Sequence, residues 1–80
     1  MSIYNNNLMK DKRLTIIAAN LKAERHRKSL SQEQLAEISG SSTNSISKIE
    51  RAEQLPSILM IYDISKALGI DIYDLLKNLD

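Results

Sequence analysis

The 80-residue sequence predicts a compact all-α domain made of five short helices. In five successive segments, apolar residues recur at three- and four-residue spacing, which is the period of an amphipathic helix. Residues that cap helices, serine or aspartate before a segment and glycine after it, separate most of these segments. A chain of this length forms a single domain, so the helices are expected to share one core.

The first helix is expected over residues 11–28. One of its faces carries residues at helical spacing, namely Leu14, Ile17, Ala18, Leu21 and Arg25. Residues 1–10 contain three consecutive asparagines and show no sustained period, so they are expected to form a flexible tail before the domain of residues 11–80. No apolar run in the sequence reaches the ~18 residues that a membrane span needs, so no contact with a membrane is expected.

The second and third helices are short and follow each other closely. Ser31 and Gln34 have the spacing of a capping box, so the second helix begins directly after Ser31 and ends near Gly40. Ser42 is the expected cap of the third helix, which extends to about Arg51. The inward-facing residues of these two helices are expected to be Leu35, Ala36, Ile46 and Ile49.

The fourth and fifth helices occupy the carboxy-terminal part of the chain. Pro56 and Ser57 mark the start of the fourth helix, and Gly69 marks its end. Its helical period is kept by Ile58, Ile61, Tyr62, Ile64, Ser65 and Leu68. Asp71 and Asp74 repeat the capping spacing at the start of a fifth helix. The apolar residues of this last helix are Leu75, Leu76 and Leu79.

The net charge of +1 hides an uneven distribution of charge along the chain. Residues 10–28 carry seven basic and two acidic side chains, a net charge of +5, whereas residues 29–56 and 57–80 each carry two basic and four acidic ones. A basic segment suits a polyanion such as nucleic acid, although such a run also forms ordinary solvated surface. The chain contains no cysteine, which points to a reducing compartment, and the cytoplasm is the expected location.

Residues 32–51 have the pattern of a helix-turn-helix. Ala36 is a small residue at the helix crossing, Gly40 can adopt the positive φ of the turn, and Ile46 and Ile49 anchor the second of the two helices. This anchoring turns hydrogen-bonding side chains outward, namely Thr43, Asn44, Ser47 and Lys48. A helix that presents such groups near its amino end can enter the major groove of DNA and bind base edges. The same residues would also form a plain polar helix face.

The segment LSQEQLAEISGSSTNSISKIERAEQLPS, residues 30–57, resembles the helix-turn-helix of the lambda-repressor and Cro-like proteins, the XRE family. The ISKALGIDIYDLL that follows resembles the end of the same domain. The resemblance implies a lambda-repressor-like domain that regulates transcription, as a repressor or controller, from a palindromic operator. The family usually has apolar residues in place of Ser39 and Ser41 and glycine in place of Ala52, which affects the expected packing around the turn and the exit of the third helix.

The resemblance also implies roles for individual residues. The expected contacts with DNA bases come from Thr43, Asn44, Ser47 and Lys48. The expected contacts with DNA phosphates come from Gln32, Ser42, Arg51 and Gln54, with the acidic Glu53 as an unfavourable neighbour. Arg25 of the first helix is expected to form a structural ion pair with Glu50, and loss of Glu50 would then strand the arginine in a partly buried setting.

The fourth and fifth helices carry more apolar residues than one small core needs: Leu59, Met60, Ile72, Tyr73, Leu76 and Leu79. Contiguous exposed apolar surface marks protein contacts, and helix-turn-helix modules usually dimerise so that two recognition helices reach major grooves about 34 Å apart. A twofold homodimer through these residues is therefore predicted. Alternatively, they complete the core of a monomer.

Double-stranded DNA is the expected partner, and no cofactor, metal ion or small-molecule effector is expected. His26 is the only histidine and has no cysteine or clustered carboxylate beside it, which disfavours a metal site. Asp71 and Asp74 are better explained as helix caps than as an acid–base pair, so an enzyme is disfavoured. The main alternative is a protein-binding module, such as an antitoxin or scaffold, whose apolar carboxy-terminal face binds a different protein.

Overall fold

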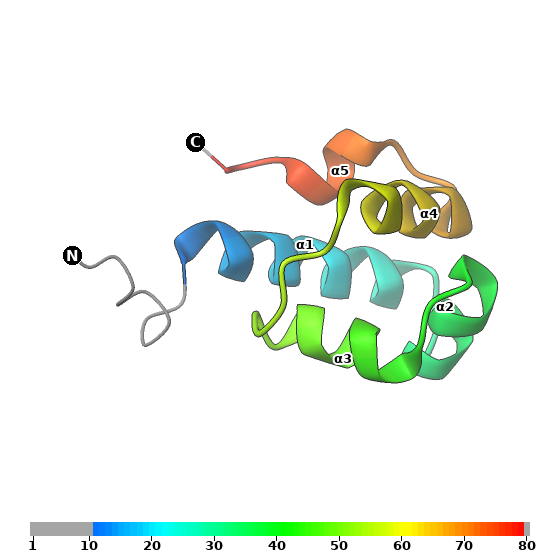
Figure 1. Ribbon diagram of the computed structural model, residues 1–80. Helices are drawn as coiled ribbons and strands as arrows, with labels where there is room; N and C mark the ends of the chain where they lie inside the picture. Colours follow the sequence, from blue (N-terminus) through cyan, green and yellow to red (C-terminus); the bar gives the residue numbers. More distant parts are fainter. Residues whose placement is uncertain (1–10, 80) are drawn as a thin grey trace.

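Five α-helices make up residues 11–79, the part of the chain that the computed structural model describes (Figure 1). They are α1 (Lys12–Arg27), α2 (Gln32–Ser39), α3 (Thr43–Glu50), α4 (Ile58–Leu68) and α5 (Ile72–Leu76). No strand occurs within these residues. The predicted all-α fold and its order of helices are therefore confirmed, whereas the predicted tail of residues 1–10 lies outside the described residues.

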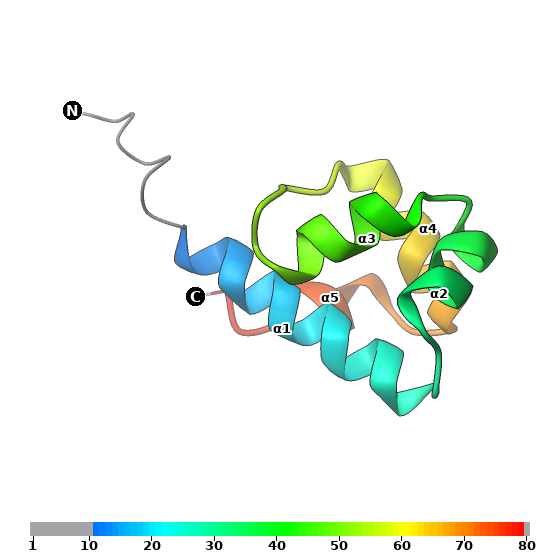
Figure 2. The same cartoon turned by 90° about the horizontal axis from the view of Figure 1, so that it is seen from below.

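The longest helix, α1, runs through the middle of the bundle. In Figure 1, α3 lies below α1, α4 and α5 lie above it, and α2 closes the end near the carboxyl terminus of α1. Every helix contributes to a single core, whose buried residues include Ile17, Leu21, Leu35, Ala36, Ile46, Ile49, Ile61, Ile64, Leu68 and Leu75. Since α3 packs on α1 and α2, its remaining surface faces outward, toward the viewer in Figure 2.

The predicted amino-terminal caps are present. Ser31, Ser42, Ser57 and Asp71 are extended residues whose side chains accept a hydrogen bond from the first turn of the following helix. The capping box of α2 is complete, because the amide of Ser31 also donates to the Oε1 of Gln34 at 2.8 Å. Asp71 and Asp74 form a second complete box at α5. The helix starts therefore follow from local hydrogen bonding.

Four helices end in a left-handed residue, but only two of these residues are glycine. Gly40 (φ 75°) and Gly69 (φ 69°) end α2 and α4 as predicted, whereas Ser29 (φ 58°) and Ala52 (φ 60°) follow α1 and α3. Behind Ala52, the amide of Glu53 donates to the carbonyl of Lys48 at 2.8 Å, which is the bond that closes a Schellman motif. The exit of α3 is thus regular, at the cost of holding an alanine in a conformation that favours glycine.

Two details of α4 and α5 differ from the prediction. Ile58 and Tyr62 belong to the apolar period of α4 but are 68% and 46% exposed, because the neighbouring positions 61, 64, 65 and 68 face the core. The last helix ends at Leu76, and Leu79 lies beyond it. The buried Asn20 explains this early end, since its Nδ2 donates to the carbonyls of Leu75 and Lys77, both at 3.0 Å.

The turn between α2 and α3 accommodates two serines where the family usually has apolar residues. The Oγ of Ser39 lies 3.1 Å from the Oγ of Ser41, to which it donates, and 3.4 Å from the carbonyl of Ala36. Within residues 11–79, every buried side-chain nitrogen and oxygen has a hydrogen-bond partner. The two hydroxyls therefore add polar contacts at the turn without leaving a buried group unsatisfied.

Candidate nucleic-acid interface

The helix α3 has an apolar face and a polar face on opposite sides. Ile46 and Ile49 are 0% and 1% exposed and hold the helix against the core. The opposite side, here called the α3 polar face, consists of the four predicted base-contacting residues Thr43, Asn44, Ser47 and Lys48. Three of them are exposed and Ser47 is half-buried. Because these positions fall on one side of a helix with 3.6 residues per turn, they form one continuous strip.

The amino-terminal end of α3 is shaped by Ser42. Its Oγ accepts a hydrogen bond from the amide of Ser45 and donates one to the Oγ of Ser45, both at 3.0 Å. The first turn of α3 contains no acidic side chain. The positive end of the helix dipole is therefore not offset within that turn, which makes the surroundings of Ser42 favourable for an anion such as a phosphate.

The predicted ion pair between Arg25 and Glu50 joins α1 to the last residue of α3. The Nε and Nη2 of Arg25 donate to the two carboxylate oxygens of Glu50 at 2.7 and 2.9 Å, and the side chains are only 10% and 2% exposed. The Nη1 of Arg25 donates to the carbonyl of Leu30 at 2.8 Å. This bidentate, buried pair is structural, because it fixes the end of α3 against α1.

Gln32, a predicted phosphate contact, also belongs to this buried network. Its Nε2 donates to the Oε1 of Glu50 at 3.0 Å, and the side chain is half-buried. The network thus ties the first residue of α2 to the last residue of α3. To contact a phosphate, Gln32 would have to donate the second hydrogen of its amide nitrogen.

The electrostatics of the network favour the charged forms of both partners. Burial by itself would raise the pKa of Glu50, but hydrogen bonds from Arg25 and Gln32, together with the positive charges of Arg25 and Lys22, lower the pKa below its ordinary value of 4.5. The hydrogen bond to Glu50 raises the pKa of Arg25, outweighing the opposite effect of burial. Glu50 is therefore a carboxylate at neutral pH, as the ion pair requires.

The carboxyl-terminal end of α3 carries a second arginine–carboxylate contact, this time on the surface. The Nη2 of Arg51 donates to the Oε1 of Glu53 at 3.1 Å, and the side chains are 51% and 47% exposed. The Nη1 of Arg51 donates to the Oγ of Ser47, within the α3 polar face. The hydrogen bond to Glu53 raises the pKa of Arg51. Gln54, the other predicted phosphate contact of this loop, is half-buried.

The residues predicted to form a dimer interface divide into two groups. Leu59 and Tyr73 are 71% and 66% exposed. The other four are half-buried and pack against the core: Met60, Ile72, Leu76 and Leu79. Further exposed apolar residues lie near Leu59 in the sequence, and we use the name α4 apolar surface for the set Leu55, Ile58, Leu59 and Tyr62. The sequence pattern did not identify Leu55, which lies in the loop before α4.

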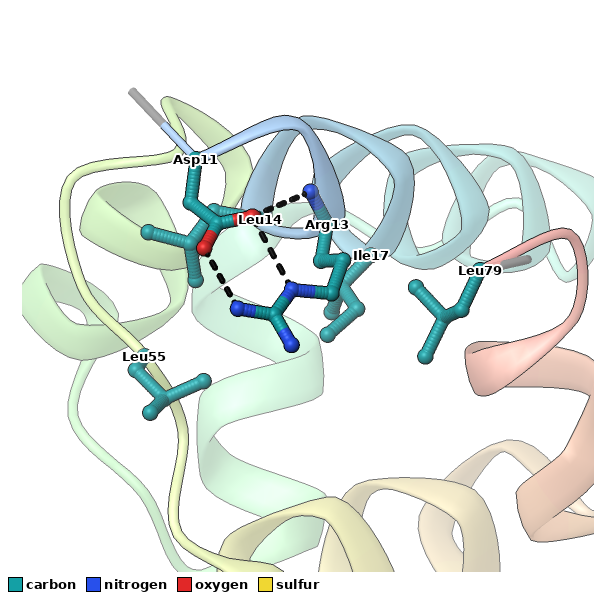
Figure 3. A pocket seen from close by; sticks show the side chains of 6 residues that line it. All are labelled: Asp11, Arg13, Leu14, Ile17, Leu55 and Leu79. Atoms are coloured by element: carbon teal, nitrogen blue, oxygen red, sulfur yellow. Dashed lines mark hydrogen bonds and ion pairs between the residues drawn. The ribbon is translucent and has the colours of Figure 1, made fainter. Parts of the chain in front are cut away.

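A pocket of about 330 Å³ lies beside the first turns of α1 (Figure 3). Its lining is largely apolar and comes from Leu14, Ile17, Leu55 and Leu79, with Asp11 and Arg13 at one side. The Nη2 of Arg13 lies 2.7 Å from the Oδ2 of Asp11. Hydrogen bonds from the side chain and the amide of Arg13 lower the pKa of Asp11 to about 2. The two polar residues of the pocket are thus paired with each other.

We also searched the described residues for metal sites and membrane-spanning helices. Residues 11–79 contain no group of three or more histidine, cysteine, aspartate or glutamate side chains that could hold a metal ion. The Nε2 of His26 lies 3.2 Å from the Nη2 of Arg25, beside the buried ion pair. Among these residues, no helix is both long and apolar enough to span a membrane.

Comparison with known proteins identifies relatives of the whole helix-turn-helix. A helix-turn-helix family model, HTH_3, matches residues 21–75. The control protein C.SmaI from Serratia marcescens is 39% identical over 63 residues, which span 79% of this chain and 75% of that protein. The uncharacterized HTH-type transcriptional regulator y4dJ from Sinorhizobium fredii is 29% identical over 65 residues, or 81% of this chain and 84% of that protein.

Solved structures agree with these relatives. The crystal structure of the restriction-modification controller protein C.AhdI from Aeromonas hydrophila has a TM-score of 0.79 and 31% identity, covering 81% of this chain and 98% of that chain. The family and the fold are those of DNA-binding regulators and not of enzymes. With α2 and α3 in the matched region and the polar face of α3 open, the chain belongs to the XRE-type helix-turn-helix family of DNA-binding transcriptional regulators.

Proposed function

We propose that this chain binds a palindromic operator as a homodimer and regulates transcription, with α3 as the recognition helix. The observation that carries the proposal is the orientation of α3, whose buried isoleucines leave Thr43, Asn44 and Lys48 exposed on the opposite face. A polar helix face of this kind fits the major groove, which offers a distinct pattern of donors and acceptors at each base pair. The proposed location is the cytoplasm, because a chain without cysteine is typical of a reducing compartment.

Base recognition is assigned to the α3 polar face. Asn44 can form two hydrogen bonds with adenine, Lys48 can donate to guanine, and the Thr43 methyl group can contact thymine. Phosphate contacts are assigned to Gln32, Ser42, Arg51 and Gln54, which lie at the ends of α2 and α3 or in the following loop. Such contacts orient the protein on the duplex, while the base contacts select the sequence.

Dimerisation is assigned to the α4 apolar surface together with Tyr73. Leu55, Ile58 and Leu59 are each about 70% exposed, which is unusual for adjacent large apolar side chains in a monomer. On α4, positions 58, 59 and 62 share one face of the helix, so a second copy can cover them together. A twofold axis through this surface would present two recognition helices to a palindromic site.

The relatives support a controller type of regulator. C.SmaI is named a control protein and C.AhdI a restriction-modification controller protein, and the match to C.AhdI covers 98% of that chain. We propose that the present chain acts through its own concentration, because dimerisation and operator binding are coupled equilibria. No small-molecule effector is required by this mechanism.

Selection of bound duplexes from a random pool tests the DNA-binding part of the proposal. We expect a palindromic consensus, and Asn44→Ala and Lys48→Ala should each weaken binding to that duplex by about 1–3 kcal/mol while leaving the melting temperature unchanged. Lys28→Ala is the matched control, because it removes the same charge from an exposed lysine at the end of α1, outside both α3 and the α4 apolar surface. Equal affinity of all three variants for the selected duplex would refute base recognition by α3.

Light scattering on the same samples tests the assembly. Leu59→Glu places a charge in the α4 apolar surface, and since Leu59 is 71% exposed the monomer should still fold. We expect this variant to be monomeric and to lose operator affinity, whereas Ile38→Glu, at an exposed apolar residue of α2, should remain dimeric. A wild-type chain that is monomeric and binds only together with a different protein would favour the alternative of a protein-binding module.

A further inference from the structure

Glu53 places a negative charge at the end of the helix that is proposed to bind DNA, and the fold holds it there. The amide of Glu53 donates to the carbonyl of Lys48 at 2.8 Å, behind Ala52 in its left-handed conformation. The amide of Arg51 donates to the carbonyl of Ser47 at 3.0 Å. Both backbones are thus fixed at the end of α3, and the Glu53 carboxylate lies 3.1 Å from the Arg51 guanidinium.

The same guanidinium reaches back to the α3 polar face. Its Nη1 donates to the Oγ of Ser47, while its Nη2 donates to Glu53. A serine hydroxyl has one hydrogen to donate, and Arg51 already occupies one of its acceptor positions. Ser47 therefore keeps its hydrogen and one acceptor position, and the hydrogen suits acceptors such as the N7 of a purine or the O4 of thymine.

The pair also changes the charge that DNA phosphates meet. Binding without regard to sequence depends on the number of phosphates that lysine and arginine neutralise. Arg51 lies on the same side of α3 as the polar face, where Lys48 supplies the other positive charge. With Glu53 beside it, Arg51 adds almost no net charge to this surface, so its attraction for an arbitrary phosphate is largely offset.

We propose that Glu53 is a specificity-determining residue, which offsets the charge of Arg51 and holds it against Ser47 so that binding to arbitrary DNA sequences is suppressed. This inference rests on the proposed function. Arg51 then approaches the DNA backbone only where the base contacts of α3 bring the two together. Glu53 acts through Arg51 and does not itself contact a base.

The test compares Glu53→Gln with Glu37→Gln, which makes the same change at an exposed glutamate of α2. Affinity for a scrambled duplex is measured over a range of salt concentrations. For each recognition helix, we expect Glu53→Gln to bind the scrambled duplex about tenfold more tightly at 0.1 M salt and to steepen the salt slope by about 0.9, as one additional phosphate contact would. The ratio of affinities for selected and scrambled duplexes should fall, whereas Glu37→Gln should change neither quantity comparably.

Repeating Glu53→Gln in a variant that lacks Arg51 separates the effect of the Arg51–Glu53 pair from the effect of the Glu53 charge alone. In the Arg51→Gln variant, the additional change Glu53→Gln should give a clearly smaller gain on the scrambled duplex, because it relieves only the repulsion between Glu53 and the phosphates and frees no cation for a phosphate contact. An equal gain in both backgrounds, or a gain no larger than that of Glu37→Gln, overturns the inference. If the wild-type chain prefers no duplex from the random pool, the proposed function itself fails; if it prefers one but Glu53→Gln behaves like the control, only the present inference fails.

Discussion

Replacing Glu50 by alanine is expected to lower the free energy of unfolding by about 3–5 kcal/mol. The carboxylate accepts hydrogen bonds from the Nε and Nη2 of Arg25 and from the Nε2 of Gln32, all between 2.7 and 3.0 Å. Without it, the Arg25 guanidinium keeps the carbonyl of Leu30 but loses its counter-charge while only 10% exposed. A domain of this size has roughly 4–12 kcal/mol of total stability, so the loss is a large part of it.

Urea denaturation followed by circular dichroism measures this loss, and two variants control for its cause. Glu53→Ala removes a carboxylate from an arginine pair on the surface and should cost far less, because exposed ion pairs contribute little. The double variant Arg25→Met/Glu50→Leu removes both buried charges and should recover most of the stability. If Glu50→Ala costs no more than Glu53→Ala, or if the double variant is as unstable as the single one, a stranded buried charge is not the cause.

The pH dependence of stability follows from the same pair. Burial alone would raise the pKa of Glu50, but its hydrogen bonds and the neighbouring positive charges lower it below 4.5 in the folded chain. A carboxylate with a lowered pKa contributes stability that is fully present above its unfolded pKa and is lost as the pH falls through the folded value. The wild-type chain should therefore lose stability below about pH 4.5, and Glu50→Gln should lack this part of the acid dependence.

Two further variants test the hydrogen bonds that Asn20 donates at the end of α5, here called the clamp, and the left-handed conformation of Ser29 after α1. Asn20→Ala should cost about 2 kcal/mol and increase amide exchange in α5, because the carbonyls of Leu75 and Lys77 lose their shared buried donor; unchanged stability in urea would contradict the clamp. Ser29→Gly should raise the free energy of unfolding by about 1 kcal/mol, since Ser29 has a φ of 58° and an exposed side chain, and a melting temperature that stays constant or falls would contradict the expected relief of strain.

Features set by neighbouring residues were predictable from the sequence. The helix starts at Ser31, Ser42, Ser57 and Asp71 depend on side chains that bond to amides two or three residues away, so the spacing alone identifies them. The two glycines that end α2 and α4 are equally local signals. The left-handed conformations of Ser29 and Ala52 gave no such signal, because neither residue type favours a positive φ.

Features that depend on contacts between distant segments were harder to predict. Arg25 and Glu50 are 25 positions apart, and only the family resemblance indicated their pairing. Asn20 reaches residues 55 and 57 positions away, so nothing near it in the sequence indicates the early end of α5. On α4, apolar residues occupy two neighbouring faces, and the helical period does not distinguish the buried Ile61 from the exposed Ile58.

At the end of α3, two consecutive residues have different roles, one in folding and one in the proposed recognition of DNA. Glu50 faces the core and pairs with Arg25, whereas Arg51 faces outward and pairs with Glu53. The buried pair fixes where the helix lies, because breaking it leaves a desolvated charge. The exposed pair contributes little to stability, so its partners can change the charge presented to DNA without changing the fold. Substitutions at Glu50 should therefore affect DNA binding through folding and through the position of Gln32, while substitutions at Glu53 should affect it through Arg51 in a folded protein.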